Sequence, residues 1–423
     1  MFNLINQKHP KGLYLLFCVE MWERFAYYGM RAMLVLYMIQ GLVFSTQQAS
    51  IVYGVYTGLV YLTPIIGGYL ADRYLGQRKC ITIGAVLMII GLLTLCIDNQ
   101  VVFFLALFIM IVANGFFKSN ISTIVGMLYD GDNEKKDSGF TIFYMGINLG
   151  ALLSPLICGT LAVLYGFRVG FLSAGIGMLI GLSVYKLFEK KLLKDYGLKP
   201  SFSNVNSEEK FSVVLTKEEK RKIFSLFVLM FFSILFWIGY EQAGSSLTLF
   251  AEYAINRSLF GFVIPTEYFQ SLNPMFIIIL APLISYIWIF MNKRGKEPSS
   301  VSKFAIAFLV ISMAYFLLYL VTKSGEAVIS PIWLAIYYFI STIAELCLSP
   351  IGLSLVSKLA PVQFASMLMG TWFLASFIGN LFAGVFAGFY NSVSHNLFFL
   401  FFAVILFLGG VFLLLLKPRL VID

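Results

Sequence analysis

The fold of this chain can be inferred from residues 20–31, which read EMWERFAYYGMR. The run carries two glutamates and two arginines, yet it lies inside the apolar stretch 13–39. A helix needs about 20 mostly apolar residues to cross a bilayer, so this stretch is long enough to span one. Because a charge facing lipid costs several kcal/mol, we expect these side chains to face a protein interior or a wet cavity.

The composition of the whole chain supports a membrane protein. Of its 423 residues, 60% are hydrophobic and 12% are charged, and the mean hydropathy is +0.87. Soluble domains carry about 25% charged residues, so this chain could not cover its surface with polar groups in water. The aromatic content of 17% argues equally against disorder.

Apolar stretches of spanning length recur along the chain and predict an all-α integral membrane protein. The twelve predicted spans are 13–39, 48–71, 80–98, 101–122, 139–164, 169–188, 223–250, 268–291, 303–322, 330–350, 364–390 and 395–416. One hydrophilic connection divides them, which predicts an N-terminal six-helix bundle (1–188), a cytoplasmic linker (189–221) and a C-terminal six-helix bundle (222–423). Two bundles with a substrate site between them are typical of transporters.

The loop charges predict the orientation. If the N-terminus is cytoplasmic, 24 of the 30 Lys and Arg residues lie on the cytoplasmic side and three on the other. The positive-inside rule therefore places both termini in the cytoplasm. The net charge of +9 is then a topology signal, and we expect no nucleic-acid partner.

Seven charged residues remain inside the predicted spans. They are Glu20, Glu23, Arg24, Arg31, Lys118, Glu241 and Glu345. Those on the first helix share a wedge of about 100° with Tyr27 and stand at spacings that allow pairing. The seven sum to −1 when all are ionised, so one bound proton would neutralise the set, and a surplus carboxylate in such a cavity is a plausible proton-coupling site.

The sequence contains little that indicates an enzyme or a metal-binding protein. The five cysteines have no metal-ligand spacing, and the two histidines are His9, before the first span, and His395, at the edge of the last one. No phosphate loop, nucleophile elbow or zinc-binding His motif occurs. We therefore expect neither an enzyme, nor a metal, nor a cofactor.

Six segments of the chain match known signatures in order. They are 20–29 (EMWERFAYYG), 67–79 (GGYLADRYLGQRK), 143–150 (FYMGINLG), 241–245 (EQAGS), 269–274 (FQSLNP) and 345–350 (ELCLSP). On these segments the sequence resembles the proton-dependent oligopeptide transporters, a branch of the major facilitator superfamily. The resemblance implies the superfamily fold without the two extra inter-bundle helices of many bacterial relatives, because the linker is too short and polar for them.

The resemblance also implies a function and a substrate site. A proton-coupled symporter would import di- and tripeptides by alternating access, driven by the proton gradient alone. Arg31 and Lys118 would bind the peptide carboxylate and Glu345 the ammonium group. The remaining implied substrate-binding residues are Tyr27, Tyr28, Tyr61, Asn148, Trp237, Asn273, Trp372, Phe373 and Ser376.

Coupling and gating are implied in the same way. Glu20, Glu23 and Arg24 would pair with Lys118, and Glu241 would pair with Arg31 when no peptide is bound. Asp72 and Arg73 would gate the cytoplasmic helix ends. The fourth-helix motif departs from the family pattern, because Ser119 stands where proline is expected, so we expect a straighter helix beside Lys118.

Two alternatives remain open at this point. A same-fold proton symporter could carry another small solute, such as an amino acid or nitrate, or the chain could be a peptide sensor that does not transport. The resemblance favours a multi-pass protein of the cell inner (plasma) membrane that works as a monomer, with peptide, protons and the lipid bilayer as its partners.

Overall fold

The computed structural model describes residues 9–129, 133–200, 216–259, 261–324, 329–359 and 365–420. The helices in the first half are α2 (Lys11–Leu36), α3 (Thr46–Leu70), α4 (Gln77–Thr94), α5 (Gln100–Met127), α6 (Asn133–Tyr165) and α7 (Phe167–Leu193). Those in the second half are α8 (Lys217–Tyr240), α9 (Ser246–Tyr253), α10 (Leu272–Lys293), α11 (Ser300–Lys323), α12 (Pro331–Leu359), α13 (Ala365–Ala387) and α14 (His395–Leu416).

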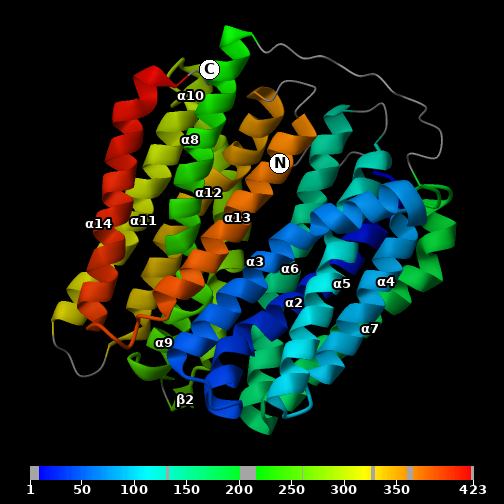
Figure 1. Cartoon of the computed structure of the whole chain (residues 1–423), viewed down its shortest axis with the longest axis horizontal. Coiled ribbons are helices and arrows are strands. Elements are labelled where there is room, and N and C mark those ends of the chain that lie inside the picture. Colours follow the sequence, from blue (N-terminus) through cyan, green and yellow to red (C-terminus); the bar gives the residue numbers. More distant parts are fainter. Residues whose placement is uncertain are drawn as a thin grey trace. The chain divides into compact units, whose positions relative to one another are not determined.

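Each of the twelve predicted spans is helical over most of its length, although the span 223–250 is divided between α8 and α9. This confirms the all-α membrane fold (Figure 1). In the described part of the chain, eleven helices are long and apolar enough to cross a membrane. The helix α2 is the predicted span outside that set, because its charged residues lower its apolar character. The structure adds one antiparallel hairpin, β1 (Ser258–Leu259) with β2 (Phe262–Val263).

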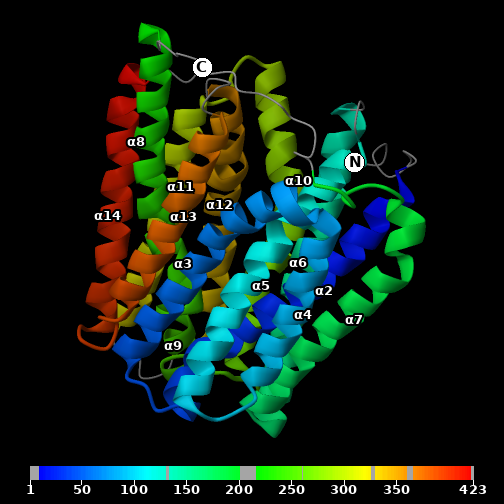
Figure 2. The same ribbon diagram turned by 45° about the vertical axis from the view of Figure 1, so that its right-hand side comes forward.

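Contacts divide the chain into two compact units. The first unit comprises 1–44, 59–207 and 265–275. Within it α2 packs against α6 and α7, and α4 packs against α5 (Figure 2). The turn η4 (Thr266–Ser271) joins this unit through α6, because Ser271 donates to the Leu152 carbonyl at 2.8 Å.

The second unit comprises 45–58, 208–264 and 276–423. In it α11 packs against both α12 and α14, and α8 packs against α13 (Figure 2). The first turns of α3 belong here, since Asn391 donates to Thr46 Oγ1 at 2.8 Å. The two units are groups of residues in contact, whereas the predicted bundles are continuous segments of the chain. The predicted boundaries at 188 and 222 therefore stay a prediction.

The connection between α7 and α8 is short. The described residues 194–200 form turns and bends rather than a helix. The interval from Lys194 to Thr216 is about the length of a single span, and two would need about 40 residues. The connection therefore has no room for the two extra helices that were predicted to be missing.

The fourth predicted span is one continuous helix, α5. The hydroxyl of Ser119 donates to the Pro64 carbonyl of α3 at 3.1 Å. A proline at 119 would have removed a backbone donor from α5 and bent it. The serine instead keeps α5 regular and ties it to the neighbouring helix, close to Lys118.

Candidate functional site

The charged stripe of α2 forms a buried ion-pair cluster in the first unit. Arg24 Nε lies 2.7 Å from Glu20 Oε1 and 2.9 Å from Glu23 Oε2. The three residues are 2% (Glu20), 0% (Glu23) and 4% (Arg24) exposed. Glu20 and Arg24 are one helical turn apart, which places their side chains side by side on one face of α2. We call these three residues the α2 cluster.

Lys118 of α5 and three tyrosines surround the α2 cluster. Lys118 interacts electrostatically with Glu20, Glu23, Arg24 and Arg31. Its Nζ lies 4.2 Å from the ring centroid of Tyr61. A cation over an aromatic face is stabilised by the ring quadrupole, so Tyr61 helps to hold Lys118 in place.

The tyrosines of α2 extend this environment. The rings of Tyr27 and Tyr28 meet edge to face at 5.2 Å. The guanidinium carbon of Arg24 lies 5.8 Å from the centroid of Tyr27, and that of Arg31 lies 6.0 Å from the centroid of Tyr28. The structure therefore brings together the predicted residues of α2, α5 and the later part of α3.

The two predicted asparagines also belong to the first unit. Asn148 of α6 is buried and donates to the Tyr144 carbonyl at 2.9 Å, one turn back on its own helix. Asn273 is the second residue of α10, and contacts place it with the first unit, whereas α10 from residue 276 onwards belongs to the second. Their predicted roles in substrate binding stay predictions.

In the second unit, Glu241 lies at a break between helices. The helix α8 ends at Tyr240, and Glu241–Gly244 form one 3₁₀ turn before α9 begins. Gln242 braces this turn, because its Nε2 donates to the carbonyls of Ile238 and Ala383 at 3.0 Å each. Glu241 itself is buried. The predicted pair of Glu241 with Arg31 joins residues of different units and stays a prediction.

Glu345 of α12 has a partner that the sequence analysis missed. The hydroxyl of Tyr240 donates a hydrogen bond to Glu345 Oε2. Tyr240 stands beside the noted Glu241, but a tyrosine in an aromatic helix carries no sequence signal of its own. Only the approach of α8 to α12 reveals the pair.

The predicted side-chain pocket residues lie on α8 and α13 of the second unit. Trp237 packs edge-on to Tyr240 with ring centroids 5.3 Å apart. A Cβ at Gly379 would lie 2.7 Å from the Cβ of Trp237, so glycine permits this close contact. Trp372 and Ser376 are buried, whereas Phe373 is half-buried.

The predicted gating residues lie at the turn after α3. Asp72 accepts a hydrogen bond from Gln77 Nε2 at 2.7 Å. Arg73 is exposed, and its Nη1 donates to the hydroxyl of Tyr69 at 3.0 Å. Gly76 has a φ of 79°, which glycine adopts without strain and which reverses the chain into α4. These contacts define the turn and leave a gating role as a prediction.

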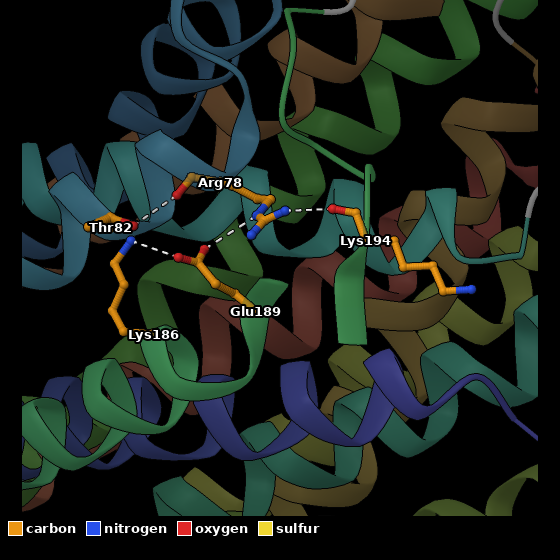
Figure 3. A network of polar contacts seen from close by, with 5 residues as sticks. All are labelled: Arg78, Thr82, Lys186, Glu189 and Lys194. Carbon is orange, nitrogen blue, oxygen red and sulfur yellow. Dashed lines mark hydrogen bonds and ion pairs between the residues drawn. The ribbon is translucent and has the colours of Figure 1, made fainter. Parts of the chain in front are cut away.

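A second buried ion pair lies at the ends of α4 and α7 (Figure 3). Arg78 Nε donates to Glu189 Oε2 at 3.3 Å, and Arg78 Nη1 donates to the Lys194 carbonyl at 2.7 Å. Lys186 Nζ donates to Glu189 Oε1 at 3.0 Å. The side chain of Lys194 points away from the network in Figure 3. We call Arg78, Lys186 and Glu189 the linker brace, because they fasten the start of the linker to α4.

Among the described residues, no three His, Cys, Asp or Glu side chains gather where they could hold a metal ion. The expected absence of a metal and of a cofactor stays a prediction.

One exposed ion pair joins the connection between α4 and α5 to the first turn of α7. Asp98 accepts a hydrogen bond from Arg168, which lowers the pKa of this carboxyl below its usual value of 3.8.

Comparison with known proteins decides the family. The model of the POT family matches residues 78–215 and 189–400. The peptide transporter YePEPT of Yersinia enterocolitica is 33% identical over 90% of this chain and 88% of its own length. The chain belongs to the POT family. As a member it is a membrane transporter and not an enzyme.

Solved structures agree on the fold. A mutant of the peptide transporter POT in complex with alafosfalin is 33% identical, with a TM-score of 0.91 over 97% of this chain and 95% of that one. A POT family transporter in complex with 5-aminolevulinic acid is 33% identical, with a TM-score of 0.90 and 97% of each chain covered. The chain therefore has the fold of the POT transporters along nearly its whole length.

Proposed function

We propose that this chain imports di- and tripeptides together with protons by alternating access. The α2 cluster carries the proposal, because its three buried charges sum to −1 and two of its carboxylate oxygens make no hydrogen bond among the described residues. The names of the related peptide transporters support the substrate class. We further propose a monomer in the plasma (inner) membrane, with both termini cytoplasmic and the proton gradient as its sole energy source.

Charge balance links the proton to the peptide. The α2 cluster sums to −1, and a buried net charge is costly unless a countercharge lies near. Lys118 supplies the balancing positive charge. When the peptide carboxylate takes Lys118 as its own partner, the cluster needs another positive charge, and a proton on Glu20 or Glu23 provides it. Peptide and proton then bind together.

The peptide ends are recognised by opposite charges. Arg31 and Lys118 bind the carboxylate, and the arginine fork suits a bidentate contact. Glu345 binds the ammonium group. Asn148 and Asn273 form hydrogen bonds with the peptide amides. The rest of the peptide is enclosed by Ser376 and by six aromatic side chains, those of Tyr27, Tyr28, Tyr61, Trp237, Trp372 and Phe373.

Glu241 couples the two halves of the cycle. We assign it a pair with Arg31 in the empty transporter. Protonation of Glu241 releases Arg31 for the peptide carboxylate. Asp72 and Arg73 hold the cytoplasmic helix ends together during alternation.

Uptake into proteoliposomes tests the proposal. With acid outside and radiolabelled dialanine as substrate, the wild-type protein accumulates peptide against its gradient. Glu23→Gln and Glu241→Gln lose this accumulation but retain peptide exchange without a proton gradient, because the amide cannot carry the proton. Glu189→Gln, the same substitution in the linker brace, retains accumulation. Unchanged uphill uptake by both coupling variants would refute coupling through these carboxylates.

A zwitterionic amino acid is the second candidate substrate. One structural relative holds 5-aminolevulinic acid, which is not a peptide. Competition against labelled dialanine by free dialanine, by its N-acetyl and amide derivatives, and by 5-aminolevulinic acid separates the two. A peptide transporter prefers free dialanine over the rest. A sensor would bind dialanine without accumulating it.

A further inference from the structure

We propose that Tyr240 is a positioning residue for the ammonium group of the substrate, acting through Glu345. The proposal rests on the proposed function, in which Glu345 binds that group, and it adds the residue that orients the carboxylate. The observation is the hydrogen bond from the Tyr240 hydroxyl to Glu345 Oε2, between α8 and α12 of the second unit.

The ring of Tyr240 is held in place by its own helix. Phe236, one turn earlier and fully buried, stacks on it with centroids 5.8 Å apart and planes 15° apart. Trp237 meets it edge-on at 5.3 Å and 89°. Aromatic neighbours in two perpendicular directions leave the ring little freedom, so its hydroxyl stays at one point beside α12.

The backbone beneath Tyr240 is also fixed. The buried hydroxyl of Tyr315 on α11 donates to the Gly239 carbonyl at 2.6 Å. The helix α8 ends at Tyr240 and continues as the 3₁₀ turn of Glu241–Gly244. The phenol therefore projects from an anchored helix end, which is a suitable support for orienting another side chain.

A phenol is well suited to orienting a carboxylate that must bind a cation. It donates one hydrogen bond and brings no positive charge, so this contact leaves the charge of Glu345 unneutralised. A carboxylate has about four acceptor positions, and one hydroxyl occupies at most one of them. The α2 cluster differs, because Arg24 brings a positive charge to the two carboxylates that it binds.

This arrangement makes Tyr240 a determinant of specificity. A fixed carboxylate favours a compact cation at one place, so the hydroxyl should strengthen binding of a free peptide N-terminus. It should contribute nothing to a peptide whose N-terminus is blocked by an acetyl group.

Tyr240→Phe tests the proposal, because it keeps the aromatic packing and removes one hydroxyl. We measure inhibition of labelled dialanine exchange by dialanine and by N-acetyl-dialanine in proteoliposomes. In the variant, inhibition by dialanine should need about tenfold more ligand, which is the size expected for the loss of a hydrogen bond to a charged group. Inhibition by N-acetyl-dialanine should be unchanged. The proposal would be overturned if inhibition by the two ligands weakened equally, or if neither weakened.

Tyr315→Phe is the matched control. It removes a buried hydroxyl that bonds the Gly239 carbonyl. It should lower thermal stability without changing the preference for dialanine over N-acetyl-dialanine. A loss of this preference equal to that of Tyr240→Phe would show that the effect comes from general loosening of α8.

The double variant separates this inference from the proposed function. Glu345→Gln alone should abolish the preference, and adding Tyr240→Phe should then change nothing further, because residues that act through one group are not additive. If Glu345→Gln keeps the preference, the assigned ammonium site is wrong. If Glu345→Gln loses it and Tyr240→Phe does not, only the role of Tyr240 is wrong.

Should Tyr240→Phe not fold, Phe236→Leu gives the same test. It keeps the hydroxyl but removes the stacked ring that fixes it. The preference for dialanine should fall partially, and an unchanged preference would count against positioning by Tyr240.

Discussion

Arg24 and Arg78 are both buried arginines paired with glutamate in the first unit, yet their surroundings differ. Arg24 is 4% exposed and Arg78 is 5% exposed. In the linker brace, Arg78 bonds both a carboxylate and the Lys194 carbonyl, and Lys186 serves the second oxygen of Glu189. This network satisfies its charged groups and joins three chain segments.

The α2 cluster leaves its groups less satisfied. Arg24 is shared between two carboxylates. Within the described residues, Glu20 Oε2 and Glu23 Oε1 make no hydrogen bond. The comparison teaches that residue type and burial alone do not distinguish the two ion pairs. They differ in the sign of their net charge and in the carboxylate oxygens that make no hydrogen bond, which is why we propose a proton site only for the α2 cluster.

The largest expected effect comes from removing each arginine. Arg24→Met should lower proton-driven dialanine uptake at least about 100-fold, because losing one partner of a buried pair costs about 3–5 kcal/mol and each 1.4 kcal/mol is about tenfold. Arg78→Met should instead lower the amount of folded protein. Uptake normalised to monodisperse protein measures both. An equal loss of normalised uptake in the two variants would show that the two ion pairs do not differ in their role in transport.

A smaller effect is expected from Glu189→Gln. The amide keeps the shape of the side chain and loses the charge, so we expect a loss of about 1–3 kcal/mol in the free energy of unfolding. Normalised uptake should stay within about twofold of wild type, which corresponds to a change of less than about 0.5 kcal/mol in the free energy of the transport step. A thermal unfolding series in detergent measures the first quantity. A variant that is as stable as wild type but has lost uptake would show that the linker brace takes part in transport.

The smallest effect is expected at the exposed pair of Asp98 and Arg168, which extends the comparison to the surface. The pKa of Asp98 is lowered in the folded state, so its contribution to stability is present above pH 3.8 and is lost as the pH falls below that value. Because both side chains are about half exposed, solvent screening keeps the contribution small. Arg168→Gln should therefore lower unfolding temperatures slightly at neutral pH and converge with wild type in acid. A difference that grows in acid would contradict this assignment.

Much of the fold was predictable because spanning a bilayer demands a long apolar helix. All twelve predicted spans fall on helices, and their ends differ from the predictions at turns such as the one after Thr94. The grouping of Glu20, Glu23 and Arg24 was also predictable, since helical periodicity places them on one face.

Contacts between helices were less accessible to prediction. Tyr240 and Glu345 are 105 residues apart, and neither periodicity nor charge links them. Arg78 counts among the basic loop residues, and such a residue satisfies the positive-inside rule regardless of its partner. Its burial against Glu189 depends on α7 packing beside α4.

The sequence by itself determined the membrane character, the helical spans, the family and the charged face of α2. These follow from local hydropathy and from spacing along one helix, which need no knowledge of neighbours. The tertiary structure alone decided how the buried charges are paired, which unit holds Asn273, and which phenol donates a hydrogen bond to Glu345. Those properties depend on side chains brought together from distant segments, and packing between helices sets their distances.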